Sequence, residues 1–493
     1  MSTIKEQKEA FVTGHTGSNP LEVLLVSSSA PIGLYLFLEL TALFQSISPS
    51  GEVSSAFLIF LEGFIILIPM VLCQTVLLYP YGATILVWEL ILATLLNRIR
   101  SYLSMHHETI RKSAMTLNEK KQPKSDEKLL FLTFYRSTIS YLTFIAILAV
   151  DFKIFPRSFA KTEVQGYGLM DLGAASFCIS GGMVSSFAKG RRNHNGVHVV
   201  KKSIPLLVMG FIRLITTKGL EYQEHVSEYG VHWNFFFTLA AVSLVSWMIR
   251  GFFTSNKSVN SNIILSLMVP CAILVLYHHA LSKHGMQQYI ENAPRHCEMN
   301  MDNHLCNFFA ANREGILGSI GYLVLYLFGE DIGRYCLWDL IGDEKKLNDV
   351  CGFRTFKVTM IFWSIFFLST VYLDIPVSRR SMSASFIFWV LAHNLSIFLF
   401  TWMACSFTFI RSGAINETIN PPTFQAVNNN SLMVFILANL MTGAVNLSMN
   451  TLKASNMEAM VALLLYLFAI GSVALLLDSN LVGSIMKRKK KKL

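Results

Sequence analysis

The sequence predicts an all-α protein, a polytopic bundle of transmembrane helices with about thirteen spans. Of its 493 residues, 53% are hydrophobic and only 15% are charged, whereas a soluble domain carries about 25% charged residues. The mean hydropathy is +0.46. The apolar residues also gather in long runs, most of which have the length that a bilayer core requires. Lipid is therefore the expected solvent for most of this chain.

The apolar runs follow one another along the chain with polar connections between them. Two of them, at 82–97 and 203–218, are short for a membrane span. The runs lie near residues 21–45, 55–79, 82–97, 129–150, 167–188, 203–218, 233–253, 261–280, 315–338, 356–376, 384–409, 431–450 and 457–478. We expect a polar N-terminal segment over 1–20 without a cleavable signal peptide, a single multi-span membrane domain over 21–480 and a basic cytosolic tail over 481–493.

Lysine and arginine gather at 98–128, at 189–202 and in the tail from Lys487 to Leu493. Such clusters face the cytosol in multi-span proteins, so thirteen spans place the C-terminus in the cytosol and the N-terminus on the lumenal side. These clusters hold much of the net charge of +10, and we expect no nucleic-acid partner. Lys490 and Lys491 stand where a dilysine retrieval signal of the endoplasmic reticulum would have them. A polybasic run beside a span also serves orientation alone.

The run at 129–150 ends on a carboxylate, Asp151, and basic residues follow at Lys153, Arg157 and Lys161. Ionisable groups this close to a hydrophobic core are costly, and in membrane proteins they mark functional sites. The alternative is an ordinary helix end at the membrane interface, with aromatic residues at the level of the headgroups and long basic side chains reaching water.

Three further polar stretches fall on the same lumenal side in this topology. Residues 220–235 hold three glutamates, two histidines, two tyrosines and an asparagine between two spans. Residues 311–316, with Tyr322, begin another span, and residues 377–380 end one more. Each stretch alone fits an interfacial loop. Four polar stretches on one face of a bundle favour a functional site.

Metal and disulfide chemistry have weak support in the sequence. His225 and His232 lack a third ligand with suitable spacing, so we expect no metal site. The eight cysteines show no Cys-x-x-Cys motif and no zinc spacing. Cys297 and Cys306 lie in a polar segment predicted to be lumenal, where a disulfide can form. Two unpaired thiols are the alternative that we favour.

Ordered motifs occur from Lys8-Glu-Ala-Phe-Val12 to the last spans. They include Ala146-Ile-Leu-Ala-Val-Asp-Phe152, Ile154-Phe-Pro-Arg157, Phe159-Ala-Lys-Thr-Glu163, Met170-Asp-Leu-Gly173, Tyr222-Gln-Glu-His225, Glu228-Tyr-Gly-Val-His-Trp-Asn-Phe-Phe236, Ala311-Asn-Arg-Glu-Gly-Ile316, Ser378-Arg-Arg380, Leu437-Ala-Asn-Leu-Met-Thr-Gly443 and Val445-Asn446. Together they resemble the glycosylphosphatidylinositol (GPI) inositol acyltransferases of the PIG-W type. The chain departs from the family pattern at Lys153, where proline is usual, at Ser158, where a second arginine is usual, and at Ser381-Met-Ser383, where an Ala-Asn pair is usual.

The resemblance implies a multi-pass enzyme of the endoplasmic reticulum membrane. It would transfer a fatty acyl group, typically palmitoyl, from acyl-CoA to the inositol 2-hydroxyl of glucosaminyl-phosphatidylinositol, with acyl-CoA as co-substrate and no other cofactor. The catalytic aspartate and lysine of the family align with Asp151 and Lys161. A carboxylate at a desolvated interface suits a general base, and an ammonium suits the developing oxyanion.

The remaining candidate residues are assigned to substrate binding. The bidentate guanidinium of Arg157 suits a phosphate of the lipid or of CoA. The others lie in the polar stretches and the matching motifs: His225, Glu228, His232, Asn234, Asn312, Arg313, Arg379 and Arg380.

Two functions from other classes stay open at this point. A membrane lipid transporter or scramblase fits the number of spans, but it predicts paired broken helices in two halves, and we find no such repeat. A purely structural subunit of a membrane complex fits the composition and leaves the four polar stretches unexplained.

Overall fold

The structure, a computed structural model, is mainly helical in the part of the chain that it describes. Each of the thirteen apolar runs contains a helix, and Gly17 and Tyr167 form an isolated β-bridge. The described residues are 10–11, 13–47, 53–76, 81–111, 129–190, 196–217, 226–254, 263–297, 304–340, 344–412 and 421–478. The predicted all-α membrane bundle is therefore confirmed.

Among these residues, ten helices are long and apolar enough to cross a membrane. Two shorter apolar helices cover Leu169–Met183 and Phe235–Gly251. Helix α9 (Gly196–Thr217), which carries Lys201, Lys202 and Arg213, is not among the ten. The exact count of thirteen spans is not confirmed.

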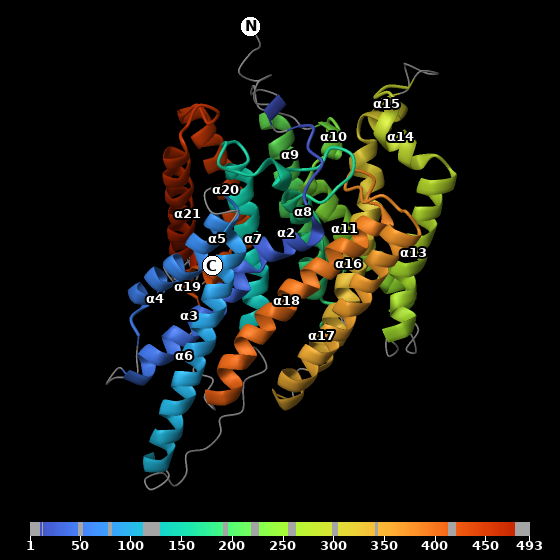
Figure 1. The fold of residues 1–493 in the computed structure, drawn as a ribbon. Helices are drawn as coiled ribbons and strands as arrows, with labels where there is room; N and C mark the ends of the chain where they lie inside the picture. Colours follow the sequence, from blue (N-terminus) through green and yellow to red (C-terminus); the bar gives the residue numbers. More distant parts are fainter. Residues whose placement is uncertain are drawn as a thin grey trace, which may run out of the picture. The chain divides into compact units, whose positions relative to one another are not determined.

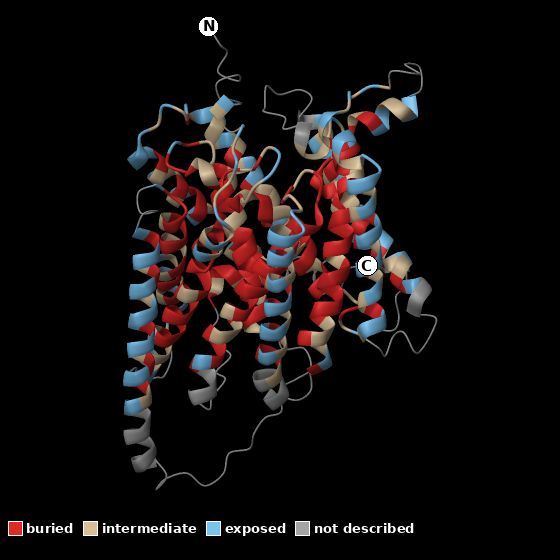
Figure 2. Ribbon diagram, turned by 45° about the vertical axis from the view of Figure 1, so that its right-hand side comes forward, coloured by how far each residue is buried: buried red, intermediate tan, exposed pale blue. Residues whose placement is uncertain are grey.

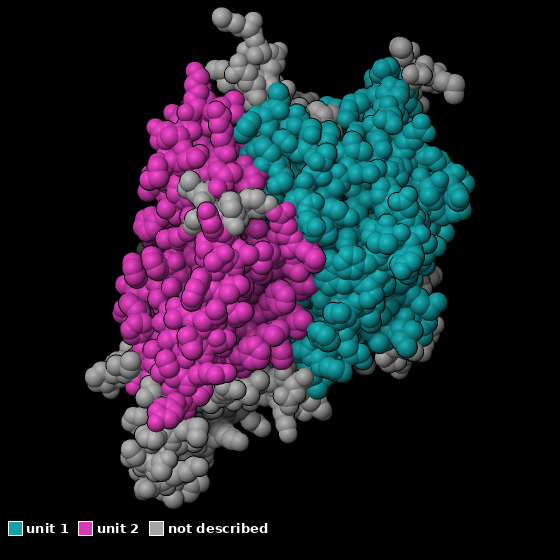
Figure 3. All heavy atoms as spheres, in the orientation of Figure 1, with its two compact units in different colours: residues 1–20, 157–395 teal, residues 21–156, 396–493 magenta. Residues whose placement is uncertain are grey.

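The chain forms two compact units, which Figure 3 colours separately. Unit 1 comprises residues 1–20 and 157–395, and unit 2 comprises residues 21–156 and 396–493. Asp151 thus belongs to unit 2 and Lys161 to unit 1. The limits of the membrane domain expected over 21–480 stay a prediction.

Unit 1 is built around α16, which contacts α8, α10, α11, α13 and α17 (Figure 1). The helices of unit 1 are α8 (Leu172–Met183), α9 (Gly196–Thr217), α10 (Val226–Tyr229), α11 (Phe235–Thr254), α13 (Ile263–Lys283), α14 (Met286–Asn292), α15 (His304–Ala311), α16 (Arg313–Cys336) and α17 (Glu344–Phe367), with 3₁₀ turns η3 (Arg157–Phe159), η4 (Leu169–Asp171) and η5 (Trp338–Leu340) and a π-helical turn η6 (Leu368–Tyr372). Helix α18 (Ala384–Ser412) begins in unit 1 and continues into unit 2.

Glycines allow α8 and α16 to pack backbone against backbone. A Cβ atom on Gly329 would lie 2.4 Å from the carbonyl oxygen of Ile179, and one on Gly333 would lie 2.5 Å from that of Met183. Glycines four residues apart are a common device for close helix packing in membranes, where lipid gives helices no hydrophobic reason to associate. This packing fixes α8, and with it the start of the helix near Asp171, against the central helix of unit 1.

A buried charge cluster joins α11, α13 and α16. Arg250 Nε lies 3.0 Å from Glu330 Oε2, and its Nη2 lies 2.9 Å from Asp331 Oδ2. Arg250 Nη1 also donates to Ser266 Oγ at 2.8 Å. Because buried charges are costly unless they are paired, these contacts hold the three helices in register.

Unit 2 contains the helices that precede residue 157 and those that follow residue 395, apart from residues 1–20. They are α2 (Pro20–Ser27), α3 (Ser29–Ile47), α4 (Ser55–Glu62), the π-helical turn η1 (Gly63–Leu67), α5 (Ile68–Cys73), α6 (Gly82–Arg111), α7 (Leu130–Ala149), the end of α18, α19 (Pro422–Asn429), α20 (Ser431–Ser448) and α21 (Asn456–Asp478). Helix α7, which leads to Asp151, contacts α19, α20 and α21.

Buried glutamates connect the helices of unit 2. The carboxylate of Glu39 on α3 pairs with Arg100 on α6 at 2.9 Å and accepts a hydrogen bond from Thr408 on α18 at 2.8 Å. The carboxylate of Glu62 on α4 accepts hydrogen bonds from the backbone N–H groups of Thr423 and Phe424, each at 3.0 Å. Glu62 therefore caps the N-terminus of α19 from another helix.

The outer faces of several helices are apolar. In Figure 2 exposed and buried residues alternate along such helices, so one face is covered and the other is open. On α13, for example, Met268, Val275 and Leu276 are 61%, 66% and 70% exposed. A continuous exposed apolar face of this kind suits contact with lipid chains.

Candidate functional site

The loop that carries Lys161 is held by backbone hydrogen bonds from two other segments. The N-terminal segment runs beside it, with Ser18 N donating to Tyr167 O at 2.8 Å and Glu163 N donating to His15 O at 3.1 Å. Gly166 N donates to Val377 O at 2.9 Å. Gly166 has a φ of +136°, and a Cβ atom there would meet the backbone of residue 16. Only glycine permits this close approach.

Lys161 is the first member of a chain of alternating charges in unit 1. Its Nζ lies 2.8 Å from Glu228 Oε2. The other oxygen of Glu228, Oε1, lies 3.3 Å from Nη1 of Arg379. Arg379 also pairs with a second carboxylate, its Nε lying 2.8 Å from Asp171 Oδ1. Two cations and two carboxylates thus balance one another across α10, the 377–383 loop and η4.

Asp171, the last member of this network, contacts the loop that carries Lys161. The buried Asp171 carboxylate accepts hydrogen bonds from Thr162 Oγ1 at 2.8 Å, from Thr162 N at 3.2 Å and from Gly168 N at 2.9 Å. Thr162 is the neighbour of Lys161 in the chain. Lys161 is therefore positioned from its side chain by Glu228 and from its backbone by Asp171.

Arg379 stays charged within this network. Burial disfavours its guanidinium charge, but the carboxylates of Glu228 and Asp171 outweigh burial and raise the pKa of Arg379 above its usual value. The guanidinium is therefore a permanent cation that fixes both carboxylates.

Asp151, in unit 2, stands two residues after the end of α7. Asn446 on α20 donates a hydrogen bond from Nδ2 to Asp151 Oδ2 at 2.7 Å. The same amide nitrogen donates to Thr442 O at 3.2 Å, which fixes its own direction. Asp151 is half-buried. The carboxylate is thus oriented by a neutral donor and keeps some access to the surroundings.

The aromatic residues after Asp151 are not an exposed interfacial belt. Phe152, Phe155 and Phe159 are 0%, 1% and 0% exposed. The loop is also anchored by Val76 N, which donates to Ile154 O at 2.7 Å. The segment is packed into the protein, which disfavours the alternative of an ordinary helix end with aromatic residues at headgroup level.

Arg157 contacts the N-terminal segment. Its guanidinium carbon lies 4.1 Å from the centre of the Phe11 ring, and Nη1 donates to Phe11 O at 3.5 Å. Its contact with a substrate phosphate stays a prediction, and in the structure its guanidinium helps to hold Phe11.

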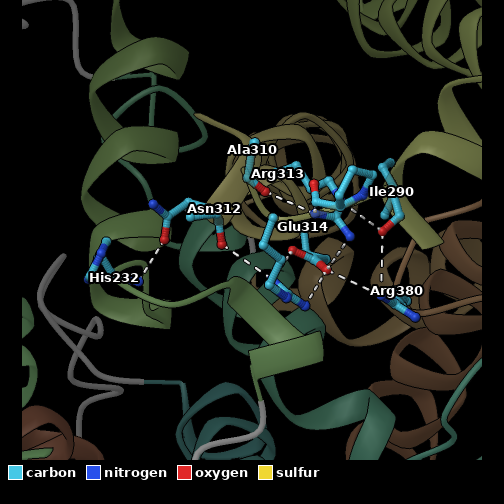
Figure 4. A network of polar contacts seen from close by, with 10 residues as sticks. His232, Ile290, Ala310, Asn312, Arg313, Glu314 and Arg380 are labelled. Atoms are coloured by element: carbon cyan, nitrogen blue, oxygen red, sulfur yellow. Dashed lines mark hydrogen bonds and ion pairs between the residues drawn. The ribbon is translucent and has the colours of Figure 1, made fainter. Parts of the chain in front are cut away.

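The predicted asparagines shape the loop between α10 and α11. Asn312 Oδ1 accepts hydrogen bonds from His232 N at 2.7 Å and from Trp233 N at 2.9 Å, and Figure 4 shows the first of these. Asn234 Oδ1 accepts from Phe236 N at 3.1 Å, which caps α11, and its Nδ2 donates to Gly210 O at 3.0 Å. These amides bind backbone groups, so their contact with substrate stays a prediction. His225 lies outside the described residues.

Arg313 and Arg380 belong to a second polar network, centred on Glu314 and drawn in Figure 4. Arg313 donates to three backbone carbonyls, those of Ile290, Pro294 and Ala310. Arg380 Nη2 lies 3.2 Å from Glu314 Oε1. The neighbours Arg379 and Arg380 therefore enter two different networks.

Contacts within unit 1 thus link residues of its polar stretches, Lys161 with Glu228, Glu228 with Arg379, and Glu314 with Arg380. The sequence did not identify Asn446 as the partner of Asp151 or Asp171 as the partner of Arg379. Asn446 and Asp171 both lie in motifs that carried the family resemblance, which was the available signal. Glu314 also lies in such a motif, whereas no sequence pattern pointed to Arg295.

Two other sequence expectations can be compared with the structure. Cys297 and Cys306 form a disulfide, so the favoured alternative of two unpaired thiols is wrong. Within the part of the chain that the structure describes, no group of three or more His, Cys, Asp and Glu side chains could hold a metal ion.

Comparisons with known proteins find matches over most of the chain. The family model described as GWT1 matches residues 4–477. A relative from Yarrowia lipolytica is 38% identical, and the match covers 73% of this chain and 74% of the relative. Relatives from Aspergillus oryzae and Candida albicans are 35% and 30% identical, each with 97% of this chain and 98% of the relative covered. All three are named GPI-anchored wall transfer protein 1.

Proposed function

The chain belongs to the GWT1 family, the GPI inositol acyltransferase family that its motifs resemble, and we propose that it is an acyl-CoA-dependent O-acyltransferase. It transfers a fatty acyl group, typically palmitoyl, from acyl-CoA to the inositol 2-hydroxyl of glucosaminyl-phosphatidylinositol. Family membership supports a role in GPI-anchor biosynthesis.

One observation carries the proposal. Asp151 and Lys161 lie ten residues apart in the chain, and each is held by a polar side chain from a helix distant in sequence. Asn446 binds Asp151 from 295 residues away, and Glu228 binds Lys161 from 67 residues away. Catalytic groups need such supporting contacts because a small misplacement costs a large part of the rate.

The proposed reaction balances with these two groups alone. The Asp151 carboxylate takes the proton of the inositol 2-hydroxyl while the hydroxyl oxygen attacks the thioester carbon. Negative charge develops on the former carbonyl oxygen, and the Lys161 ammonium stabilises it. The carbon–sulfur bond then breaks, and the proton held by Asp151 passes to the CoA thiolate. The products are an inositol ester and CoA, with no redox change and no further cofactor.

The proposed location is the endoplasmic reticulum membrane, with the N-terminus lumenal and the C-terminus cytosolic. The basic loops and tail support this orientation. The Cys297–Cys306 disulfide supports it independently, because it falls in a segment that this topology makes lumenal, where the redox conditions permit disulfides.

Release of free CoA thiol by the purified protein in lipid vesicles tests the proposal. Palmitoyl-CoA should be consumed only when glucosaminyl-phosphatidylinositol is added, and the lipid product should carry one additional acyl chain. Thiol release without the acceptor lipid would indicate a thioesterase. No release with both substrates would contradict the proposal and favour a lipid transporter or scramblase.

A further inference from the structure

The network around Glu314 holds more positive than negative charge. Arg295 binds the buried Glu314 carboxylate with both ends of its fork, Nη2 to Oε1 at 2.9 Å and Nη1 to Oε2 at 3.2 Å. Arg380 Nη2 and Arg313 Nη2 lie 3.2 Å and 3.7 Å from Oε1. We call these four residues the Glu314 cluster. Their charges sum to two positive, since a guanidinium does not lose its proton in proteins.

The neighbouring network has no such excess. Lys161, Glu228, Arg379 and Asp171 comprise two cations and two carboxylates, joined in alternation. The two networks share the 377–383 loop, which supplies Arg379 to one and Arg380 to the other. An anion from a substrate is therefore better accommodated at the Glu314 cluster than at the balanced network, because partly buried positive charge in excess is stabilised by an added anion.

Arg380 is the member with unused hydrogen-bonding capacity. Its Nε is buried and has no hydrogen-bond partner, and its side chain is 13% exposed. A buried donor without a partner costs free energy unless a ligand or water supplies an acceptor. Arg313 differs, because backbone carbonyls take up its Nε and Nη1. Arg295, at 32% exposed, leaves the cluster open to the surroundings on its side.

We infer that Arg380, together with Arg295, binds a phosphate group of a substrate. A guanidinium fork matches the geometry of two phosphate oxygens, and the charge-assisted hydrogen bonds are strong. The inference rests on the proposed function, which supplies two phosphate-bearing molecules, the acceptor lipid with its phosphodiester and acyl-CoA with its phosphates. The phosphate is thus assigned to Arg380 and not to Arg157, whose guanidinium contacts Phe11 in the N-terminal segment.

The test measures binding rather than turnover, so that its outcome does not depend on the proposed reaction. Dissociation constants of phosphatidylinositol in mixed detergent micelles and of palmitoyl-CoA are measured for the full-length wild type and for Arg380→Gln. Arg380→Gln should weaken binding of one of the two ligands about 10- to 100-fold, as expected for a lost charge-assisted contact. Arg380→Lys keeps the charge and loses the fork, so its dissociation constant for that ligand should lie between those of the wild type and of Arg380→Gln.

The ligand that loses affinity identifies the source of the phosphate. A loss confined to phosphatidylinositol assigns the lipid phosphodiester, and a loss confined to palmitoyl-CoA assigns a CoA phosphate. Arg354→Gln is the matched control, since Arg354 donates to Tyr335 O at 2.7 Å and lies outside both networks.

Unchanged affinity for both ligands in a folded Arg380→Gln protein would overturn the inference. If Arg380→Gln lowers the Tm by many degrees, Arg380→Lys decides the matter, and wild-type affinity for both ligands there would also overturn it. Failure of the acyl-transfer assay would leave these binding results intact.

Discussion

Asn446 illustrates how a single amide can orient a candidate catalytic carboxylate. Its Nδ2 binds Asp151 Oδ2 at 2.7 Å, and a second bond to Thr442 O fixes the amide. In sequence Asn446 is one polar residue in an apolar run, and 295 residues separate it from Asp151. Asp151 could be predicted because a carboxylate ends an apolar run, but nothing local indicates which distant side chain will meet it.

Asn446→Ala should lower kcat about ten- to a hundredfold, equivalent to the roughly 1.5–3 kcal/mol of a hydrogen bond to a charged group, and should change KM little. The reason is that Asp151 would keep its charge and lose its orientation. Steady-state thiol release in vesicles measures both constants. Asn439→Ala is the control, because Asn439 lies on the same helix, is exposed, and donates from its amide to a carbonyl of its own helix, Phe435 O, at 2.7 Å. An unchanged kcat in Asn446→Ala would show that the contact has no catalytic role.

At the scale of elements, α19 depends on a side chain from another helix. Its first backbone N–H groups have no partner within the helix, and Glu62 on α4 accepts from Thr423 N and Phe424 N at 3.0 Å each. Tyr141 on α7 donates to Thr423 Oγ1 at 2.9 Å. The short helix α19 therefore fixes the positions of α4 and α7 together. The apolar runs predict the spans on either side of α19, but no sequence pattern indicates this contact.

Glu62→Ala should destabilise the protein by about 2–4 kcal/mol, because it leaves buried backbone donors without an acceptor. Thermal unfolding in detergent, followed by the fluorescence of a thiol-reactive dye, should show a Tm lower by several degrees. Glu458→Ala is the comparison, since Glu458 also accepts a backbone hydrogen bond near a helix start, from Ser455 N at 2.7 Å, but is exposed. An equal change of Tm in the two variants would contradict the proposed role of Glu62.

At the scale of the whole molecule, the sequence predicts which segments become helices and leaves their partners open. Bilayer thickness imposes a local constraint on composition and length, so each apolar run could be recognised by itself. Pairs such as Lys161 with Glu228, or Arg379 with Asp171, depend on how helices pack, and no local pattern encodes them. The prediction that the polar stretches share the lumenal side depends on the basic clusters, because such clusters indicate the orientation of the chain in the membrane.

The orientation predicts the fate of terminal tags in sealed microsomes. A tag inserted after Thr3 should be protected from added protease, because the proposed orientation puts the N-terminus in the lumen, whereas a tag after Leu493 should be digested. Both tags should be digested once detergent opens the vesicles, which serves as the control. Digestion of the N-terminal tag in sealed vesicles would overturn the topology.

The central claim is that Asp151 is the base in an acyl transfer to inositol. The most direct test is the rate of acceptor-dependent CoA release by Asp151→Asn, measured in vesicles beside the wild type at equal insertion and Tm. The substitution keeps the size of the side chain and removes the base, so the rate should fall by about two to four orders of magnitude. A rate near that of the wild type would contradict the claim and direct the search for the base to His225 and His232.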